Sequence, residues 1–142
     1  MTDTWQFWAL TAAVFAALTA IFAKVGISGL NSDFATFIRT LVIIAALAGF
    51  LSVTGQWQNA STISSRSWLF LILSGLATGG SWIAYFRALQ LGQASQVAPV
   101  DKLSIVLVAI FGVTFLGEKL SLLNWFGVVM IGGGVVLMTL RL

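Results

Sequence analysis

The 142-residue sequence contains no cysteine and no histidine. Without cysteine it can form neither a disulfide framework nor a thiolate metal site. Without histidine it lacks the commonest general base and the commonest metal ligand in proteins. We therefore expect that the protein is not an enzyme and that it uses no cofactor and no bound metal. Its few acids offer no credible catalytic pair: they are Asp3, Asp33, Asp101 and Glu118.

Charged residues are scarce as well, at 8% of the chain against 59% hydrophobic residues. A surface that faces water needs far more charge than this. The pI near 10 does not indicate a nucleic-acid partner, because the basic residues stand singly between apolar runs and form no patch. The composition instead indicates a protein that lies in a lipid bilayer.

Five apolar stretches reach the ~20 residues that a helix needs to cross a bilayer. They cover residues 5–24, 34–54, 68–88, 95–116 and 122–140. The sequence thus predicts an all-α, polytopic membrane protein with five transmembrane helices, in which residues 1–142 form one domain. The leader before Trp5 has no basic residue, so we interpret the first stretch as a retained span and not as a signal peptide. Asp33 is placed to cap the second helix.

The basic residues outside the apolar runs give a weak orientation signal. On the side of the N-terminus lie Arg66 and Lys119, and on the other side lie Lys24, Arg87 and Arg141, with Arg39 and Lys102 nearer to this second side. A count of two against five favours an external N-terminus and an internal C-terminus. Insertion in both orientations is the alternative.

Three charged residues, Arg39, Asp101 and Lys102, lie well inside the predicted helices. A charge at the centre of a membrane helix costs about 2.5 to 3.5 kcal/mol, so it usually faces a bundle interior or a wet cavity. The three lie at a similar depth, about 9 Å from the same side at 1.5 Å per residue. Asp101 and Lys102 point about 100° apart on one helix, so we expect them not to neutralise each other. Arg39 is then the expected partner of Asp101, which leaves Lys102 unpaired in a cavity; alternatively, Arg39 and Lys102 extend to the headgroups.

Other residues near these charges allow two interpretations each. Trp82 and Tyr85 are three residues apart, so they share a helix face that can line a transport route. Pro99 is either tolerated near the start of its helix or allows the helix to bend beside the charges. Small residues such as Gly75 and Gly79 either permit close helix packing or leave a gap for substrate passage.

Four motifs occur between Tyr85 and Gly134: Tyr-x-x-Ala-Leu, Ala-Ser-x-Val-Ala-Pro, Phe-Leu-Gly-Glu-Lys-Leu and a Gly-rich last span. In these motifs the chain resembles the EamA-type repeat of the drug/metabolite transporter superfamily. Typical members contain two five-helix repeats in inverted orientation, and this chain is similar to one repeat. The resemblance implies a homodimer, most naturally antiparallel, and it places Lys102 where sugar-phosphate members contact phosphate. The first helix lacks the carboxylate of the small multidrug transporters, which argues against that mechanism.

We therefore expect a secondary carrier in the cell (inner or plasma) membrane that moves a small polar metabolite, anionic or zwitterionic, by alternating access as a dimer. The expected substrate-binding residues are Lys102, Asp101, Arg39, Trp82 and Tyr85. No nucleotide-binding glycine loop is present, so ATP hydrolysis on this chain does not drive the movement. The alternative is a non-transporting membrane assembly or regulatory subunit.

Overall fold

The computed structural model describes residues 4–140, so Asp3 and Arg141 lie outside the described residues. Five helical segments in the described range are long and apolar enough to cross a bilayer, which confirms the predicted fold class. They are Trp5–Gly26, Ser32–Thr54, Ser65–Leu91, Ala94–Phe115 and Leu122–Thr139. Their limits lie within a few residues of the predicted spans.

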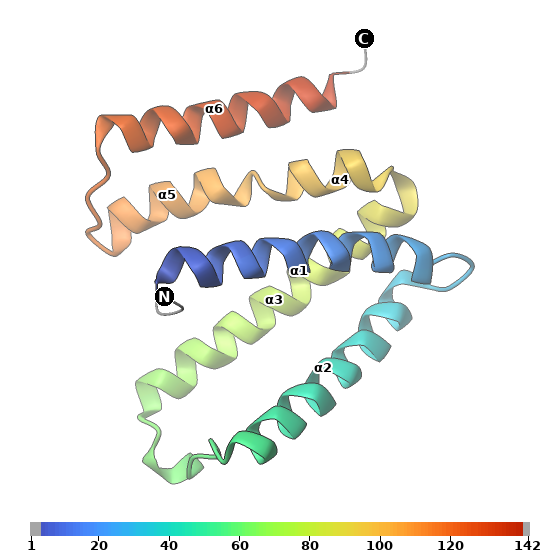
Figure 1. The fold of residues 1–142 in the computed structure, drawn as a ribbon, viewed down its shortest axis with the longest axis vertical. Coiled ribbons are helices and arrows are strands. Elements are labelled where there is room, and N and C mark those ends of the chain that lie inside the picture. Colours follow the sequence, from blue (N-terminus) through green and yellow to red (C-terminus); the bar gives the residue numbers. More distant parts are fainter. Residues whose placement is uncertain (1–3, 141–142) are drawn as a thin grey trace. The chain divides into compact units, whose positions relative to one another are not determined.

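The helices form two compact units, of which the first ends at Leu91 and the second begins at Gly92. The first unit contains α1 (Trp5–Gly26), α2 (Ser32–Thr54), the short 3₁₀ turn η1 (Ala60–Thr62) and α3 (Ser65–Leu91). The second unit contains α4 (Ala94–Asp101), α5 (Ser104–Phe115) and α6 (Leu122–Thr139). Figure 1 labels these helices. That residues 1–142 form a single domain stays a prediction.

Local side-chain bonds determine where α2 begins. The Oδ1 atom of Asn31 accepts hydrogen bonds from the N–H groups of Asp33 at 2.9 Å and Phe34 at 3.1 Å, which makes Asn31 the N-cap. The prediction that Asp33 caps this helix was therefore wrong, because the helix begins at Ser32. The Asp33 carboxylate is left available for a partner on another helix.

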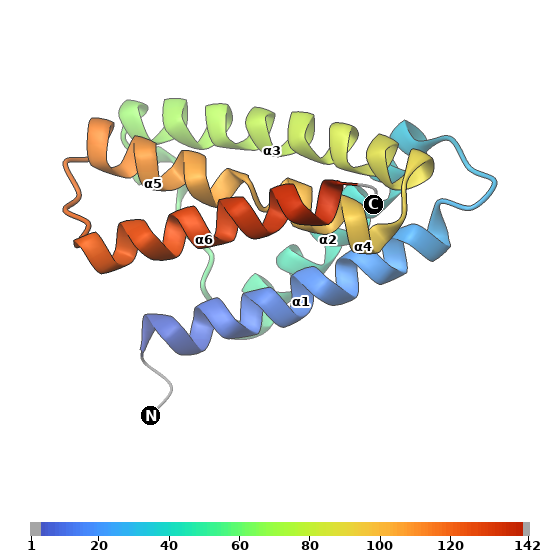
Figure 2. The same cartoon turned by 90° about the horizontal axis from the view of Figure 1, so that it is seen from above.

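In the first unit, α2 and α3 run antiparallel, and both α1 and α2 contact α3 (Figures 1 and 2). The α2 side chains that become buried are small, namely Ser32 and Thr36, whereas α3 contributes Phe86 and Leu89. The Thr36 hydroxyl donates to the Ser32 carbonyl at 2.9 Å, so its polar group is satisfied within the helix. Small, satisfied side chains let two membrane helices approach closely.

The fourth span is not continuous, because α4 ends at Asp101 and α5 begins at Ser104 (Figure 1). At the interruption the Lys102 N–H is shared between the carbonyls of Ala98 at 3.3 Å and Pro99 at 3.0 Å, which tightens the turn. Pro99 itself lies inside α4, which continues past it to Asp101, so which of the two interpretations of Pro99 holds stays a prediction. In the second unit, α6 runs back along both α4 and α5.

The connection between α5 and α6 folds back over α5. Gly117 has a φ of +68°, a left-handed conformation that glycine adopts without penalty. The Glu118 N–H then donates to the Gly112 carbonyl at 3.0 Å. A Cβ atom on Gly112 would lie 2.5 Å from Oε2 of Glu118, so a larger residue here would displace the end of the Glu118 side chain.

The other small residues have less contact within their units. A Cβ on Gly132 of α6 would make ordinary contact with Val106, 3.4 Å away. A Cβ on Gly75 or Gly79 of α3 would meet no other atom of the first unit within 4 Å. Close packing inside this unit therefore does not explain the glycine spacing on α3.

Candidate functional site

Arg39 lies on α2, seven residues after Ser32, which places it about 10 Å along the helix. Its guanidinium carbon lies 3.9 Å from the centre of the Trp82 ring and 5.4 Å from that of Phe86, both on α3. Trp82 and Phe86 are one helical turn apart and so present one face toward α2. Because the guanidinium is held at the depth of Trp82, it does not extend to the end of the helix.

The described part of the first unit contains one acid, Asp33, and this acid already has a partner. The Arg87 Nη2 atom lies 2.6 Å from Asp33 Oδ2, and Arg87 Nε donates to Oδ1 at 3.0 Å. This bidentate pair joins the start of α2 to the last turns of α3. Arg39 therefore has no carboxylate partner within the described part of the first unit.

The contact with Trp82 stabilises Arg39 only in part. A cation–π contact contributes about 0.5 to 2 kcal/mol, depending on how far the pair is removed from water. The cost of an arginine near the centre of a membrane helix is about 2.5 to 3.5 kcal/mol. The difference favours an anionic partner for Arg39 that the first unit does not itself supply.

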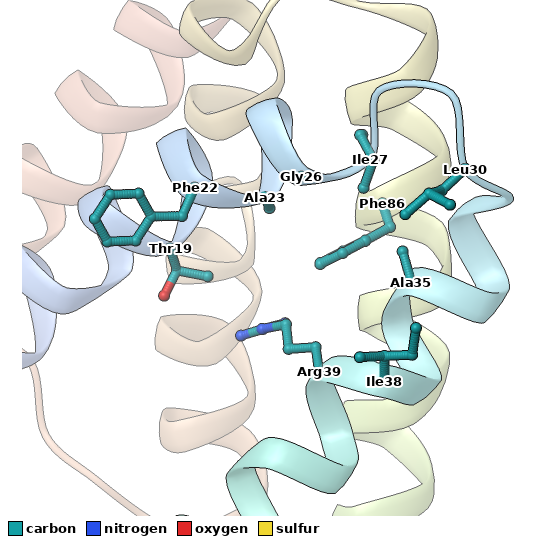
Figure 3. A pocket seen from close by; sticks show the side chains of 10 residues that line it. All are labelled: Thr19, Phe22, Ala23, Gly26, Ile27, Leu30, Ala35, Ile38, Arg39 and Phe86. Carbon is teal, nitrogen blue, oxygen red and sulfur yellow. The ribbon is translucent and has the colours of Figure 1, made fainter.

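A cavity of about 350 Å³ borders Arg39. Its wall is formed by α1, the connection to α2, the first turns of α2 and one side chain of α3 (Figure 3). The lining residues are Thr19, Phe22, Ala23, Gly26, Ile27, Leu30, Ala35, Ile38, Arg39 and Phe86. The cavity thus combines an apolar wall with one positive charge.

Hydrogen bonds at the ends of the helices hold this wall in place. The Lys24 ammonium donates to the Leu89 carbonyl, and the Gln90 side-chain amide donates to the Leu30 carbonyl at 2.6 Å. Both bonds tie the α1–α2 region to the end of α3. Ile27, which is buried, lines both this cavity and a second hollow of about 390 Å³ that Lys24 and Gln90 also line.

In the second unit, Lys102 Nζ lies 3.2 Å from Asp101 Oδ2. The expectation that these neighbours cannot neutralise each other was therefore wrong. It assumed a continuous helix, whereas α4 ends at Asp101 and Lys102 lies in the turn that follows. Within its own unit Lys102 is paired. The pairing of Asp101 with Arg39 stays a prediction.

The structure brings the predicted residues together in two groups: Arg39 with Trp82 and, electrostatically, Tyr85; and Asp101 with Lys102. Tyr85 is half-buried on α3 and is not among the residues that line the cavity. Phe86 lines the cavity instead. It could have been predicted from the sequence, because residues four apart such as Trp82 and Phe86 share one helix face. Thr19 was also missed, and nothing in the sequence distinguishes it from the other helical threonines.

Residues 3–140 match the EamA-like transporter family. The chain belongs to this family. The predicted resemblance is thereby confirmed, and family membership together with five apolar helices makes the chain a multi-pass membrane protein of a transporter family. No solved structure was found to match it.

Relatives of this EamA-like protein differ in length and description. The "Uncharacterized transporter in cobO 3'region" of Sinorhizobium sp is 65% identical over 138 residues, which cover 97% of this chain and 98% of that protein. The "Probable 4-amino-4-deoxy-L-arabinose-phosphoundecaprenol flippase subunit ArnE" of Hamiltonella defensa is 30% identical over 100 residues, 68% of this chain and 88% of that protein. The "Uncharacterized transporter YxxF" of Bacillus subtilis is 25% identical over 135 residues, 94% of this chain but 42% of that protein.

Proposed function

We propose that this EamA-like protein is a secondary carrier that moves a small polar metabolite, anionic or zwitterionic, by alternating access. One observation carries the proposal. Arg39 lies within a helix long enough to cross the membrane, borders a cavity, and has no carboxylate partner in the described part of its unit. An anionic group bound at Arg39 would offset part of the cost of holding this charge in the bilayer.

We also propose that the carrier is a homodimer, most naturally antiparallel. The chain aligns over nearly its whole length with the Bacillus subtilis relative but covers only 42% of it, so a second copy would supply the other half. Carriers built from inverted repeats place the substrate site at the repeat interface. The weak charge bias of the loops agrees with insertion in both orientations.

In this proposal each charged residue has a different role in substrate binding. Arg39 binds the anionic group, and Lys102 from each copy attracts the substrate toward the dimer interface. Asp101 acts as the switchable partner, pairing with Lys102 in one state and with Arg39 in another. Trp82 and Tyr85 line the route.

Uptake into proteoliposomes tests the carrier function. The protein is given a mixture of labelled anionic and zwitterionic metabolites, and accumulated compounds are identified by mass spectrometry. We expect Arg39→Gln to reduce uptake by about 10-fold or more, the loss expected for a charge-assisted hydrogen bond. Lys119→Gln removes the same charge from the exposed α5–α6 connection and should transport like wild type. Equal uptake by both variants would contradict the assigned role of Arg39.

The orientation of the chain tests the dimer. A reporter fused after Leu142 is read for cytoplasmic and external location, and a cysteine introduced at the exposed Ser64 is probed with an impermeant reagent. Signal from both sides supports the antiparallel homodimer. Signal from one side alone would contradict the antiparallel homodimer: either a different chain supplies the inverted half, or the carrier function is wrong.

A second candidate is one subunit of a transporter made from two different small chains. The description of the Hamiltonella defensa relative as a flippase subunit favours this possibility. A second membrane protein that co-purifies in equal amount, together with a single orientation of this chain, would support it. A purified homodimer that transports alone would exclude it.

A further inference from the structure

The lining of the cavity beside Arg39 narrows the class of substrate. Of its ten lining residues, only Arg39 and Thr19 have polar side chains. The largest apolar side chains of the wall are Phe22, Ile27, Leu30, Ile38 and Phe86. A ligand that is polar throughout would leave hydrogen-bonding groups unpaired against this wall, and a ligand without charge would leave Arg39 unmatched.

Thr19 differs from the other threonines of the α-helices. Seven of them donate their hydroxyl to a carbonyl of their own helix, three or four residues earlier, and these are Thr11, Thr36, Thr40, Thr54, Thr78, Thr114 and Thr139. Such back-bonding is the usual way to satisfy a helical hydroxyl. Among the described residues, Thr19 makes no such bond and lines the cavity instead. Its hydroxyl is therefore available to a ligand.

Thr19 and Arg39 stand at matching depths. Thr19 lies seven residues before Gly26, where α1 ends, and Arg39 lies seven residues after Ser32, where α2 begins. Because residues 27–31 connect these two ends, both side chains start about 10 Å from the same side of the membrane. Figure 3 shows the Thr19 hydroxyl and the guanidinium end of Arg39 in the same part of the cavity.

The contact with Trp82 leaves the donors of Arg39 available. A cation–π contact takes up no hydrogen bond of the guanidinium, whose five N–H groups match a carboxylate or phosphate. Among the described residues no hydrogen bond from these N–H groups is found; the ring contacts are with Trp82 and Phe86, and Tyr85 interacts electrostatically with the guanidinium. The guanidinium of Arg39 and the hydroxyl of Thr19 thus lie at one end of an otherwise apolar cavity.

We infer that this cavity binds an amphipathic organic anion: a carboxylate or phosphate held by Arg39 and Thr19, joined to an apolar group that packs against the remaining wall. The inference rests on the proposed carrier function and specifies its substrate class. The volume of about 350 Å³ accommodates the head and a short apolar group. Phe22 and Ile38 are 67% and 43% exposed, so a longer tail can leave the cavity along the apolar surface of the first unit.

Equilibrium dialysis with radiolabelled octyl phosphate tests this inference. The protein is held in nanodiscs of phosphatidylcholine, and binding to empty nanodiscs is subtracted. We expect saturable binding that octanoate displaces and that inorganic phosphate or octanol at the same concentration does not. Competition by inorganic phosphate as strong as that by octanoate would overturn the inference, because the apolar wall would then contribute nothing.

Three variants connect the binding to the cavity. Arg39→Gln should weaken octyl phosphate binding by roughly 10-fold or more, as expected for the loss of a charge-assisted hydrogen bond. Lys119→Gln, the matched control, should bind like wild type. Ala23→Leu keeps Arg39 and fills part of the apolar wall, so it should also weaken binding while the thermal unfolding temperature stays near that of wild type. Unchanged affinity in Arg39→Gln or in Ala23→Leu would overturn the inference.

Two further arms identify the source of the anion and separate the inference from the proposed function. Adding phosphatidylglycerol to the nanodiscs lowers the apparent affinity for octyl phosphate if a lipid headgroup occupies the site, whereas unchanged affinity assigns the site to a free amphiphile. Binding of octyl phosphate without transport of any compound would retain the cavity as a site for an amphipathic anion and would overturn the carrier function. Transport of polar anions without octyl phosphate binding would retain the carrier function and overturn the inference.

Discussion

The guanidinium carbon of Arg39 lies 3.9 Å from the centre of the Trp82 ring, so a charge on the second span rests on an aromatic ring of the third. Both residues were singled out from the sequence, but for separate roles. Their contact fixes the direction of the Arg39 side chain and places its N–H groups at the border of the cavity.

The first prediction concerns this contact. Trp82→Leu should lower the free energy of unfolding by about 0.5 to 2 kcal/mol beyond the loss of apolar area, since it removes the ring beneath the cation. A double-mutant cycle with Arg39→Gln, measured by denaturation in mixed micelles, isolates this energy. Additive effects of the two substitutions would show that the contact contributes nothing.

The second prediction concerns the pair that joins α2 to α3. Asp33→Asn or Arg87→Gln should destabilise the first unit only slightly, because the two side chains are 44% and 60% exposed and solvent screens their attraction. The exchanged pair Asp33→Arg with Arg87→Asp should recover part of this loss. Unfolding measured at low and high salt checks the assignment, since the contribution of an exposed pair decreases as salt increases.

The third prediction concerns the close approach of Glu118 to Gly112. Glycine to alanine in a helix normally stabilises by about 0.5 to 1 kcal/mol, and Gly127→Ala should do so because no other atom lies near the new methyl group. Gly112→Ala should gain less or lose stability, since its methyl group displaces the Glu118 carboxylate. In a Glu118→Ala background the two glycine substitutions should become equivalent, and a persistent difference would contradict this explanation.

The fourth prediction concerns the pair at the interrupted span. Asp101→Asn leaves Lys102 without its partner inside an apolar segment, so the amount of folded protein in membranes should fall. The double variant Asp101→Asn with Lys102→Gln removes both charges and should recover expression. Fluorescence-detected size-exclusion chromatography of detergent extracts measures both. A double variant that is no better than the single one would show that the pair does not matter for folding.

The spans could be predicted because length and hydropathy alone decide whether a helix crosses a bilayer. The start of α2 was harder, because Asn31 and Asp33 are both good capping residues and only the backbone geometry selects Asn31. The interruption after Asp101 was also beyond the sequence, since Pro99 is compatible with a straight helix and with a bent one.

Charge partners depend on which helix faces which, and a single sequence does not contain this information. Lys102 was expected to be unpaired and is paired, whereas Asp33 was expected to be a cap and binds Arg87. The role proposed for Thr19 depends on its hydroxyl not bonding to a carbonyl of its own helix, and the sequence does not show which helical threonines lack this bond. Position along each helix, by contrast, follows from counting residues, and Arg39 lies inside a helix that is long and apolar enough to cross a bilayer, as predicted.

A positive charge inside a membrane helix, such as that of Arg39, also responds to the membrane potential. Arg39 gives an empty cavity one positive charge, whereas a bound monoanion would cancel it. A potential of 100 mV acts on each elementary charge with about 2.3 kcal/mol across the full bilayer, and in proportion over part of it. In the proposed carrier, the membrane potential would therefore drive the empty site toward the negative side and leave the loaded site nearly unaffected, so the return step of its transport cycle would be the electrogenic one.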